Sequence, residues 1–403
     1  MVAAPSLRLL NLQMPLQRAG RLALLKNKLL TVRISAFVRS VHHHHFFLVV
    51  SVVVFISLTA PAQDVTELKV RAEKGDVSAE SALAKAYHTG EGVAKNEAEA
   101  VRWWEKAAEQ GDTVSQVNLG VAYHFGQGVP MNFATAARWY RRAAEQGNAA
   151  AQTDLAVLYQ LGQGVPRDNA EAVRWWRKAA AQDVTVAQLN LGTAYYLGAG
   201  VEKDDAEAVR WYRKAAEKGN ATAQFRLGMA HVYGAGVPKN EAEGIKWLRK
   251  SAEQGNAEGQ FWLGFSYHSG AGVEKNDAEG VRWCSKAAEQ GLAVAQYNLG
   301  QAYSSGEGVA RNPAEAARWW QKAAEQGVAK AQYNLGLAYH NGAGLQKDEV
   351  EAYFWVNLAA SSLDQGFVKE SRENIGKSLT AAQLWEVQGR CRKWVDAHPN
   401  TEK

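Results

Sequence analysis

Pairs of glycine residues are the first feature of this chain that could do chemistry, because glycine-rich loops often bind phosphate groups. A nucleotide-binding loop follows a β-strand, opens a helix and carries a third glycine. Here each pair follows a stretch with helical periodicity and lacks the third glycine. The pairs are therefore predicted to be turns, and no phosphate cofactor is expected. The motif Gly-x-Gly-Val or Gly-x-Gly-Leu occurs eight times, beginning at Gly90, Gly126, Gly162, Gly198, Gly234, Gly270, Gly306 and Gly342.

Other chemical motifs are few. The sequence contains no His-Glu-x-x-His, no cysteine pairs at zinc spacing and no Gly-x-Ser-x-Gly. His42 to His45 are adjacent and could bind a metal ion, but they lie beside an apolar run of the leader described below. We therefore expect no catalytic residue, no cofactor and no metal site, and we interpret the chain as non-enzymatic. A hydrolase built on the repeats would need a nucleophile and a base that the sequence does not show.

The glycine pairs recur every 36 residues, and other residues follow the same period. A repeat of this length is typical of a solenoid, in which each unit buries its apolar face against its neighbours. The period predicts eight stacked units, which present surfaces rather than enclosed active sites. One tryptophan per unit stands thirteen residues after the first glycine: Trp103, Trp139, Trp175, Trp211, Trp247, Trp283, Trp319 and Trp355.

Each unit contains two stretches with apolar residues at helical spacing, which we name helix A and helix B. In the second unit, helix A is predicted over residues 113–125 and helix B over residues 133–146. The glycine after helix B, Gly147 in this unit, is predicted to end the helix in a left-handed conformation. Asp183 replaces it in one unit. Mid-helix glycines such as Gly120 indicate close helix packing, and the tryptophans are predicted to lie in the core.

The last complete unit shows a specific family resemblance. Residues 331–344 read Ala-Gln-Tyr-Asn-Leu-Gly-Leu-Ala-Tyr-His-Asn-Gly-Ala-Gly, and Glu-Ala-Tyr-Phe-Trp follows at 351–355, before two alanines at 359 and 360. This pattern resembles the Sel1-like repeat, a relative of the tetratricopeptide repeat. The resemblance covers the eight units. It implies an all-α fold, a right-handed α-solenoid of eight helix-turn-helix repeats, which serves as a protein-interaction scaffold.

The chain departs from the cysteine-rich branch of that family, in which each repeat carries a disulfide. It has two cysteines, Cys284 and Cys391. Cys284 takes the helix B position of Trp104 and Tyr140, so it is predicted to be a buried apolar residue. Whether the two cysteines are bridged stays open. The β-lactam-related activity attributed to the cysteine-rich branch is not expected here.

Four segments divide the chain. Residues 1–62 form a basic leader, residues 63–75 an N-terminal capping helix, residues 76–363 the repeats and residues 364–403 the C-terminal capping helices. The N-terminal cap is predicted because Leu68, Ala72 and Gly75 match the register of helix B. In the C-terminal segment, Thr380 and Gln383 have the spacing of a capping box that begins a helix.

The leader has the composition of a targeting segment. A 13-residue apolar run at 46–58 and Ala-Pro-Ala at 60–62 follow its basic residues, as in a secretory signal peptide. A membrane-spanning helix needs about 20 apolar residues. We therefore predict cleavage after Ala62 and a periplasmic or secreted protein; an uncleaved membrane anchor, an organellar transit sequence and a start at Met14 are the alternatives. The leader lacks Asp and Glu, and its basic residues are Arg8, Arg18, Arg21, Lys26, Lys28, Arg33 and Arg39.

The leader also accounts for the positive charge of the chain. The formal net charge is +5, but residues 63–403 hold 39 Lys and Arg against 41 Asp and Glu. Nucleic-acid binding needs a basic surface, so no nucleic-acid partner is expected. The charged residues of helix B are interpreted as a solvated face with ion pairs four residues apart.

The variable positions of helix A are the candidate binding residues. Numbering each unit from the residue after the helix B glycine, positions 3, 6, 10 and 13 share one face of helix A. By the family resemblance, this face lines a concave groove. Its aromatic residues concentrate in the second half, and the histidines at position 13 (His88, His124, His268 and His340) are interpreted as solvated groove residues. The candidate partner-binding residues are Phe225, Met229, Phe261, Phe265, His268, Tyr297, Tyr333 and Leu337.

These observations predict a monomeric scaffold that binds a protein or peptide partner, with the groove residues of units five and six as the centre of the site. Apolar groove residues can anchor a peptide or an amphipathic helix. They can equally fill the inside of a tight superhelix. An envelope scaffold that binds a glycan or peptidoglycan is the first alternative function, and a hydrolase is the second.

Overall fold

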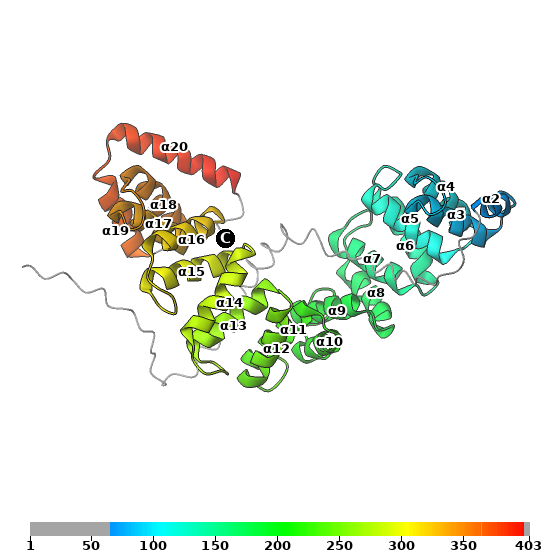
Figure 1. Ribbon diagram of the computed structural model, residues 1–403, viewed down its shortest axis with the longest axis horizontal. Helices are drawn as coiled ribbons and strands as arrows, with labels where there is room; N and C mark the ends of the chain where they lie inside the picture. The colour runs from blue at the N-terminus through cyan, green and yellow to red at the C-terminus, as the bar shows by residue number, and fades with distance from the viewer. Residues whose placement is uncertain (1–64, 364, 399–403) are drawn as a thin grey trace, which may run out of the picture. The chain divides into compact units, whose positions relative to one another are not determined.

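The computed structural model describes residues 65–363 and 365–398 (Figure 1). The predicted cleavage site and His42 to His45 lie outside the described residues. Within the described ranges the chain forms 19 helices and no strand. None of these helices combines the length and the apolar character that crossing a membrane requires.

Helices A and B alternate through eight units, as the period predicts. The A helices are α3 (Val77–Thr89), α5 (Thr113–Phe125), α7 (Ala149–Leu161), α9 (Thr185–Leu197), α11 (Ala221–Tyr233), α13 (Ala257–Ser269), α15 (Ala293–Ser305) and α17 (Ala329–Asn341). The B helices are α4 (Glu97–Glu109), α6 (Phe133–Glu145), α8 (Asn169–Ala181), α10 (Asp205–Glu217), α12 (Glu241–Glu253), α14 (Asp277–Glu289), α16 (Pro313–Glu325) and α18 (Glu349–Ser362). The capping helices are α2 (Val65–Glu73), α19 (Gly366–Gly376) and α20 (Ala381–Ala397).

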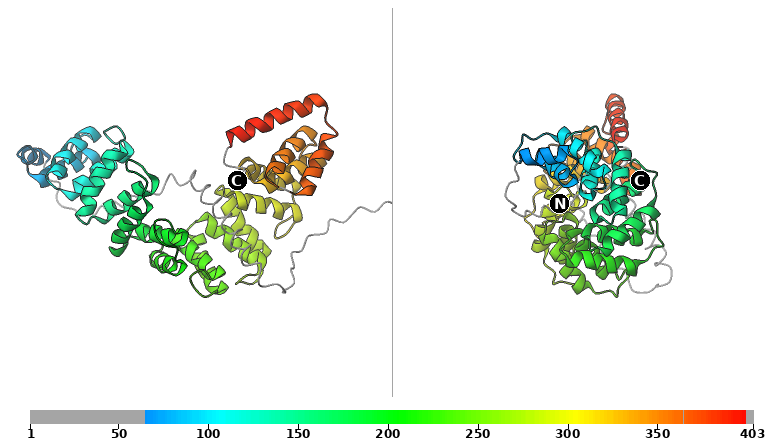
Figure 2. Two further views of the ribbon diagram at one scale, coloured as in Figure 1. Left: turned by 180° about the vertical axis from the view of Figure 1, so that it is seen from behind. Right: turned by 90° about the vertical axis from the view of Figure 1, so that its right-hand side faces the viewer.

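Each helix packs against the helices that precede and follow it in the chain, so the units form a solenoid (Figures 1 and 2). The eight leucines at position 8 of helix A form the innermost part of the core, and each is no more than 1% exposed. At the C-terminal end, α19 and α20 both pack on α18. The predicted capping box of Thr380 and Gln383 begins α20, and Val387 and Cys391 of that helix are buried.

Short polar side chains set where helix B begins. Asn or Asp precedes every B helix, and its side-chain oxygen accepts hydrogen bonds from backbone amides of the first turn, as Asn132 does from Thr135 at 3.0 Å. These caps satisfy amides that have no partner inside the helix. The capping residues are Asn96, Asn132, Asp168, Asp204, Asn240, Asn276, Asn312 and Asp348.

The two glycines of each Gly-x-Gly pair have different tasks. Gly126 ends α5 in the left-handed region at φ 70°. Gly128, at φ 72°, lies against the previous unit, where a Cβ atom would approach the Glu97 carbonyl oxygen to 2.4 Å. The second glycine therefore permits backbone-to-backbone packing between units. The mid-helix Gly120 does the same within a unit, since a Cβ would lie 2.3 Å from the Tyr140 ring.

The tryptophan stripe lies at the edge of the core. Six of the eight tryptophans are buried at 6–8% exposure, while Trp211 and Trp319 are half-buried. In seven units the outer ring face is covered by the Lys or Arg three residues later, such as Lys178 Nζ at 4.0 Å from the Trp175 centroid. The ion pairs of helix B also span three residues, not the predicted four, because a glutamate in the first turn meets an arginine one turn later.

A row of buried glutamines joins the units. Gln116 Nε2 donates to the Ala108 carbonyl oxygen at 3.1 Å, and Gln146 Nε2 donates to Gln116 Oε1 at 2.8 Å. Such bonds satisfy polar groups that would otherwise be buried without partners. The same arrangement of both bonds recurs around Gln152, Gln224, Gln260 and Gln296.

The row is interrupted at Gln188. Asp183 stands where the other units have glycine, and it is the one described non-glycine residue with a left-handed φ, at 70°. Its carboxylate accepts from Gln188 Nε2 at 2.9 Å and pairs with Lys218, which replaces the next glutamine. Gln188 Oε1 is left buried without a partner among the described residues. The Asp183 substitution noted in the sequence thus changes the contact between two units.

Candidate interaction surface

The predicted groove residues differ in their accessibility. Phe265 is 46% exposed, whereas Phe225 is 5% exposed and packs with Ile245 and Leu248. The assignment of Phe225 to the binding surface is therefore corrected: its ring fills space between α11 and α12, and a partner cannot reach it. Half-buried positions are occupied by Met229, Phe261, Tyr297, Tyr333 and Leu337.

Four aromatic residues of α11 and α13 form a contiguous aromatic cluster. The Trp262 ring lies edge-on to Tyr233 at 6.1 Å, to Phe261 at 5.7 Å and to Phe265 at 5.6 Å between ring centroids. Edge-to-face rings in this distance range attract one another. Tyr233 is 53% exposed and Phe265 46% exposed. Two rings of the aromatic cluster, Tyr233 and Phe265, are thus exposed to solvent, and both pack against Trp262.

The central residue of the aromatic cluster, Trp262, is missing from the sequence prediction. It occupies position 7 of helix A, which was not among the variable positions considered. Other units place small or polar residues there, including Asn118, Asn298 and Asn334. The sequence signal that could have identified Trp262 is an aromatic residue at a repeat position that is small or polar in the other units.

An exposed apolar row continues from the aromatic cluster toward the N-terminal units. Position 14, the last residue of helix A, is apolar and exposed in four consecutive units. In the first, sixth, seventh and eighth units the same position is Thr89, Ser269, Ser305 and Asn341. Because each of the four apolar residues ends a helix A, their side chains recur at the same point of successive units. The row consists of Phe125 (48% exposed), Leu161 (50%), Leu197 (43%) and Tyr233 (53%).

Tyr333 is partly covered by the C-terminal cap. Its ring lies edge-on to Phe367 of α19 at 5.3 Å, and its hydroxyl group lies 3.1 Å from Ser371 Oγ. Tyr297, in the preceding unit, is half-buried, and burial raises the pKa of its hydroxyl group. The eighth unit therefore contributes less accessible aromatic surface than the sequence predicted.

Three of the four histidines at position 13 form a bond to helix B, and His268 among them is also exposed to solvent. Each of the three contacts a carboxylate at the first residue of helix B. His124 has no such carboxylate partner, because the first residue of helix B in its unit is Phe133. The interpretation of His124 as a solvated residue was wrong: it is 8% exposed, it stacks on Phe125, and burial lowers its pKa. The three bonded pairs are His88–Glu97 at 2.7 Å, His268–Asp277 at 2.9 Å and His340–Glu349 at 2.7 Å.

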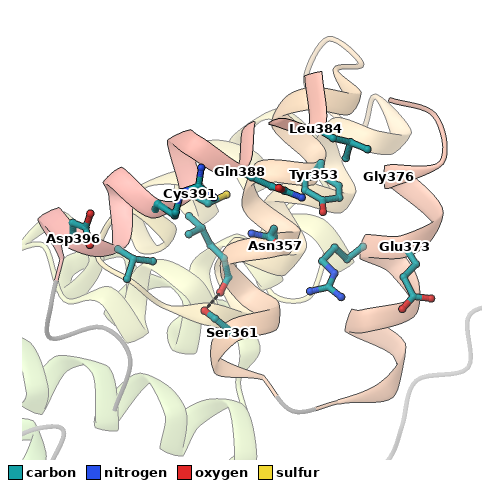
Figure 3. Close-up of a pocket in the computed structure, with 13 residues that line it drawn as sticks. Tyr353, Asn357, Ser361, Glu373, Gly376, Leu384, Gln388, Cys391 and Asp396 are labelled. Carbon is teal, nitrogen blue, oxygen red and sulfur yellow. Dashed lines mark hydrogen bonds between the residues drawn. The ribbon is translucent and has the colours of Figure 1, made fainter. Parts of the chain in front are cut away.

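A cavity of about 680 Å³ lies between α18, α19 and α20 (Figure 3). Tyr353, Asn357 and Ser361 line it from α18, and Cys391 lines it from α20. Burial raises the pKa of the Cys391 thiol, which disfavours the thiolate needed for nucleophilic attack. Cys284 is also a free buried thiol, as predicted for a small apolar residue, and burial raises its pKa to about 12.

Comparison with known proteins agrees with this architecture. The family model for the Sel1 repeat matches residues 77–112, 113–148, 149–184, 185–220, 221–256, 257–292, 293–328 and 329–362. No curated protein matches the chain.

Two solved structures are similar over most of their length. One is a protective antigen of uropathogenic Escherichia coli strains that displays an SLR fold (37% identity, TM-score 0.58, 83% of this chain and 79% of that one). The other is a Sel1 repeat protein from Oxalobacter formigenes (31% identity, TM-score 0.64, 77% of this chain and 89% of that one). With eight matched repeats and these two neighbours, the chain belongs to the Sel1 repeat family.

Proposed function

We propose that this protein is a non-enzymatic scaffold that binds a partner protein through the aromatic cluster of α11 and α13. Sel1 repeat proteins are in general protein-interaction scaffolds and non-catalytic. The observation that carries the proposal is the exposed pair of rings, Tyr233 and Phe265, held by Trp262. Large aromatic side chains fixed in place before binding are typical energetic centres of protein interfaces.

The arrangement of the rings favours a protein over a glycan. Three rings stand edge-on to Trp262 at interplanar angles of 72–88°, so none of them is parallel to the Trp262 ring and the aromatic cluster is an irregular apolar surface. The exposed row at position 14 adds one apolar side chain in each of the second, third and fourth units. A peptide or helix with spaced apolar anchors can follow such a row.

Truncating two rings of the aromatic cluster should weaken partner binding. In the double variant W262A/F265A, we expect at least about a 30-fold loss of affinity, since interface centres contribute 2 kcal/mol or more. A photo-crosslinking residue at position 265 identifies the partner in cells, and titration with that partner gives the affinity. The control variant V114A/V294A removes two exposed apolar residues of other helices, 58% and 40% exposed, and should bind normally. Retention on cell-wall sacculi that depends on Trp262 would instead establish the glycan function.

Export is the second part of the proposal, and it rests on the composition of residues 1–62. A basic region, an apolar run and a small-x-small site support cleavage after Ala62. Amino-terminal sequencing of the exported protein should give a start at Gln63. A start at Met1 or Met14 would contradict cleavage and support a membrane anchor.

A further inference from the structure

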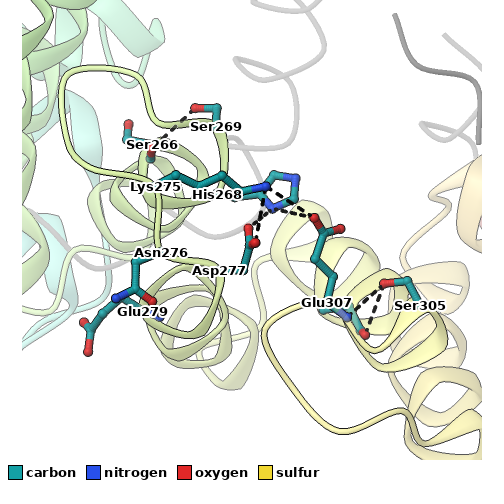
Figure 4. A network of polar contacts seen from close by, with 10 residues as sticks. Ser266, His268, Ser269, Lys275, Asn276, Asp277, Glu279, Ser305 and Glu307 are labelled. Carbon is teal, nitrogen blue, oxygen red and sulfur yellow. Dashed lines mark hydrogen bonds and ion pairs between the residues drawn. The ribbon is translucent and has the colours of Figure 1, made fainter.

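Three potential metal ligands meet where the sixth unit contacts the seventh (Figure 4). His268 belongs to the last turn of α13, Asp277 is the first residue of α14, and Glu307 lies in the Gly-x-Gly turn after α15. Nδ1 of His268 lies 2.9 Å from Asp277 Oδ1 and 3.8 Å from Glu307 Oε1. One ligand atom from each residue lies within 4.8 Å of the others.

This combination occurs once in the eight units. His88 and His340 make the same bond to a helix B carboxylate. The unit after His88, however, has Gln127 in the place of Glu307, and the C-terminal cap follows the unit of His340. The histidine–carboxylate pair is therefore a repeated feature, while the third ligand is specific to this contact between units.

The distances fit a divalent metal ion without a change of backbone. Zn²⁺ binds His nitrogen and carboxylate oxygen at about 2.0–2.2 Å, which in a tetrahedral site separates the ligand atoms by about 3.4 Å. The observed separations of 2.9 and 3.8 Å lie on either side of this value. The third separation, between the Asp277 and Glu307 oxygens, is within 4.8 Å, so rotation of the Glu307 side chain toward the other two ligands would complete the site. All three residues are accessible to an entering ion, since none of them is fully buried.

We propose that His268, Asp277 and Glu307 bind a divalent transition-metal ion of the Zn²⁺ type, with water as the fourth ligand. A nitrogen and two carboxylate oxygens suit such an ion better than Ca²⁺, which takes six to eight oxygen ligands. In the absence of an ion, His268 Nδ1 shares a hydrogen bond with Asp277 Oδ1 at 2.9 Å. A bound ion takes the lone pair of Nδ1, so the imidazole of the bound form carries its single proton on Nε2.

Lys275 competes with the ion. Its Nζ lies 3.3 Å from Asp277 Oδ2 and 3.7 Å from Glu307 Oε1, so it balances the two carboxylates. The side chain is 55% exposed and can turn toward solvent when a cation replaces it. Most units carry a lysine at this position, for example Lys95 beside Glu97, so Lys275 is a repeated residue and not an adaptation to this site.

Calorimetric titration of the full chain with Zn²⁺ tests the site. In every protein compared, His42 to His45 are replaced by glutamine because that cluster could bind the same ion. We expect one ion per chain. H268A and E307Q should each weaken binding about tenfold or more, since even outer-sphere substitutions cost 10- to 100-fold. K275A should strengthen it, and Ca²⁺ should not bind.

The eighth unit supplies the matched control. H340A removes a histidine with the same carboxylate and lysine neighbours but without the third ligand. It should leave Zn²⁺ affinity within twofold of the parent protein. Unchanged affinity in H268A, or an equal loss in H340A and H268A, would overturn the proposal. Circular dichroism of H268A checks that the exposed substitution leaves the helices intact.

Discussion

The free energy of unfolding of the variant D154N, measured relative to the parent protein, should be about 4 kcal/mol higher at pH 8 than at pH 4. Asp154 lies on α7 at 6% exposure, and its Oδ2 atom has no hydrogen-bond partner among the described residues. Burial raises the pKa of this carboxyl group from 3.8 to about 7. The same environment raises the pKa of the neighbouring Tyr140, first through burial and second through the Asp154 charge.

The direction of this pH effect follows from the protons that the folded and unfolded states of the protein bind. Between pH 4 and 7 the unfolded chain releases the Asp154 proton while the folded protein keeps it. The free energy of unfolding therefore falls as pH rises through this window, by about 1.4 kcal/mol per pH unit, and changes no further above pH 7. Asparagine cannot ionise, and it occupies the same repeat position in the second, fourth, seventh and eighth units. The variant should lack this part of the pH dependence.

Urea unfolding of both proteins from pH 4 to 8 measures the effect. Other carboxylates titrate in the same range, so the difference between the two proteins at each pH isolates Asp154. The control E145Q removes an exposed carboxylate from the adjacent helix α6 and should leave the curve unchanged. A difference between D154N and the parent that stays constant with pH would contradict the prediction.

Truncation of Trp175 to alanine should cost about 3–5 kcal/mol of stability, the usual range for a large buried aromatic side chain. The Trp175 ring is 8% exposed and is covered by Lys178. The substitution removes core volume on α8, where close backbone contact between Asn169 and Gly200 of the next unit limits collapse of the cavity. Because repeat arrays can open locally, hydrogen exchange should show the loss concentrated in α8 and its neighbours.

Trp385 provides the comparison for this substitution. It lies on α20 and is 76% exposed, so W385A should change stability by less than about 0.5 kcal/mol. Equal destabilisation by W175A and W385A would show that tryptophan content, and not burial, determines the effect.

The helices were predictable because each repeat contains its own local signals. Helix A of the second unit begins and ends at the predicted residues, and helix B ends one residue earlier than predicted. The capping box of Thr380 and Gln383 was also expected. Caps, glycines and apolar spacing act over a few residues, so one sequence is enough to read them.

The binding surface was predictable only in part. Phe265 is exposed as expected, while Phe225, at the related helix face one unit earlier, is buried. Whether a ring faces solvent depends on the side chains of the next helix, which the repeat position does not specify. Trp262 and Tyr233 meet across two units, and their contact has no counterpart in a pattern that treats units one at a time.

The sequence by itself determined the family, the number of units, the helix boundaries and the roles of the recurring glycines, because these depend on a period and on short-range backbone chemistry. The tertiary structure alone decided which non-recurring residues meet: Tyr233 with Trp262, and His268 and Asp277 with Glu307. It also decided that Asp154 is buried. Such contacts join residues of adjacent units, and the stacking of one unit on the next determines their distances and their exposure to water.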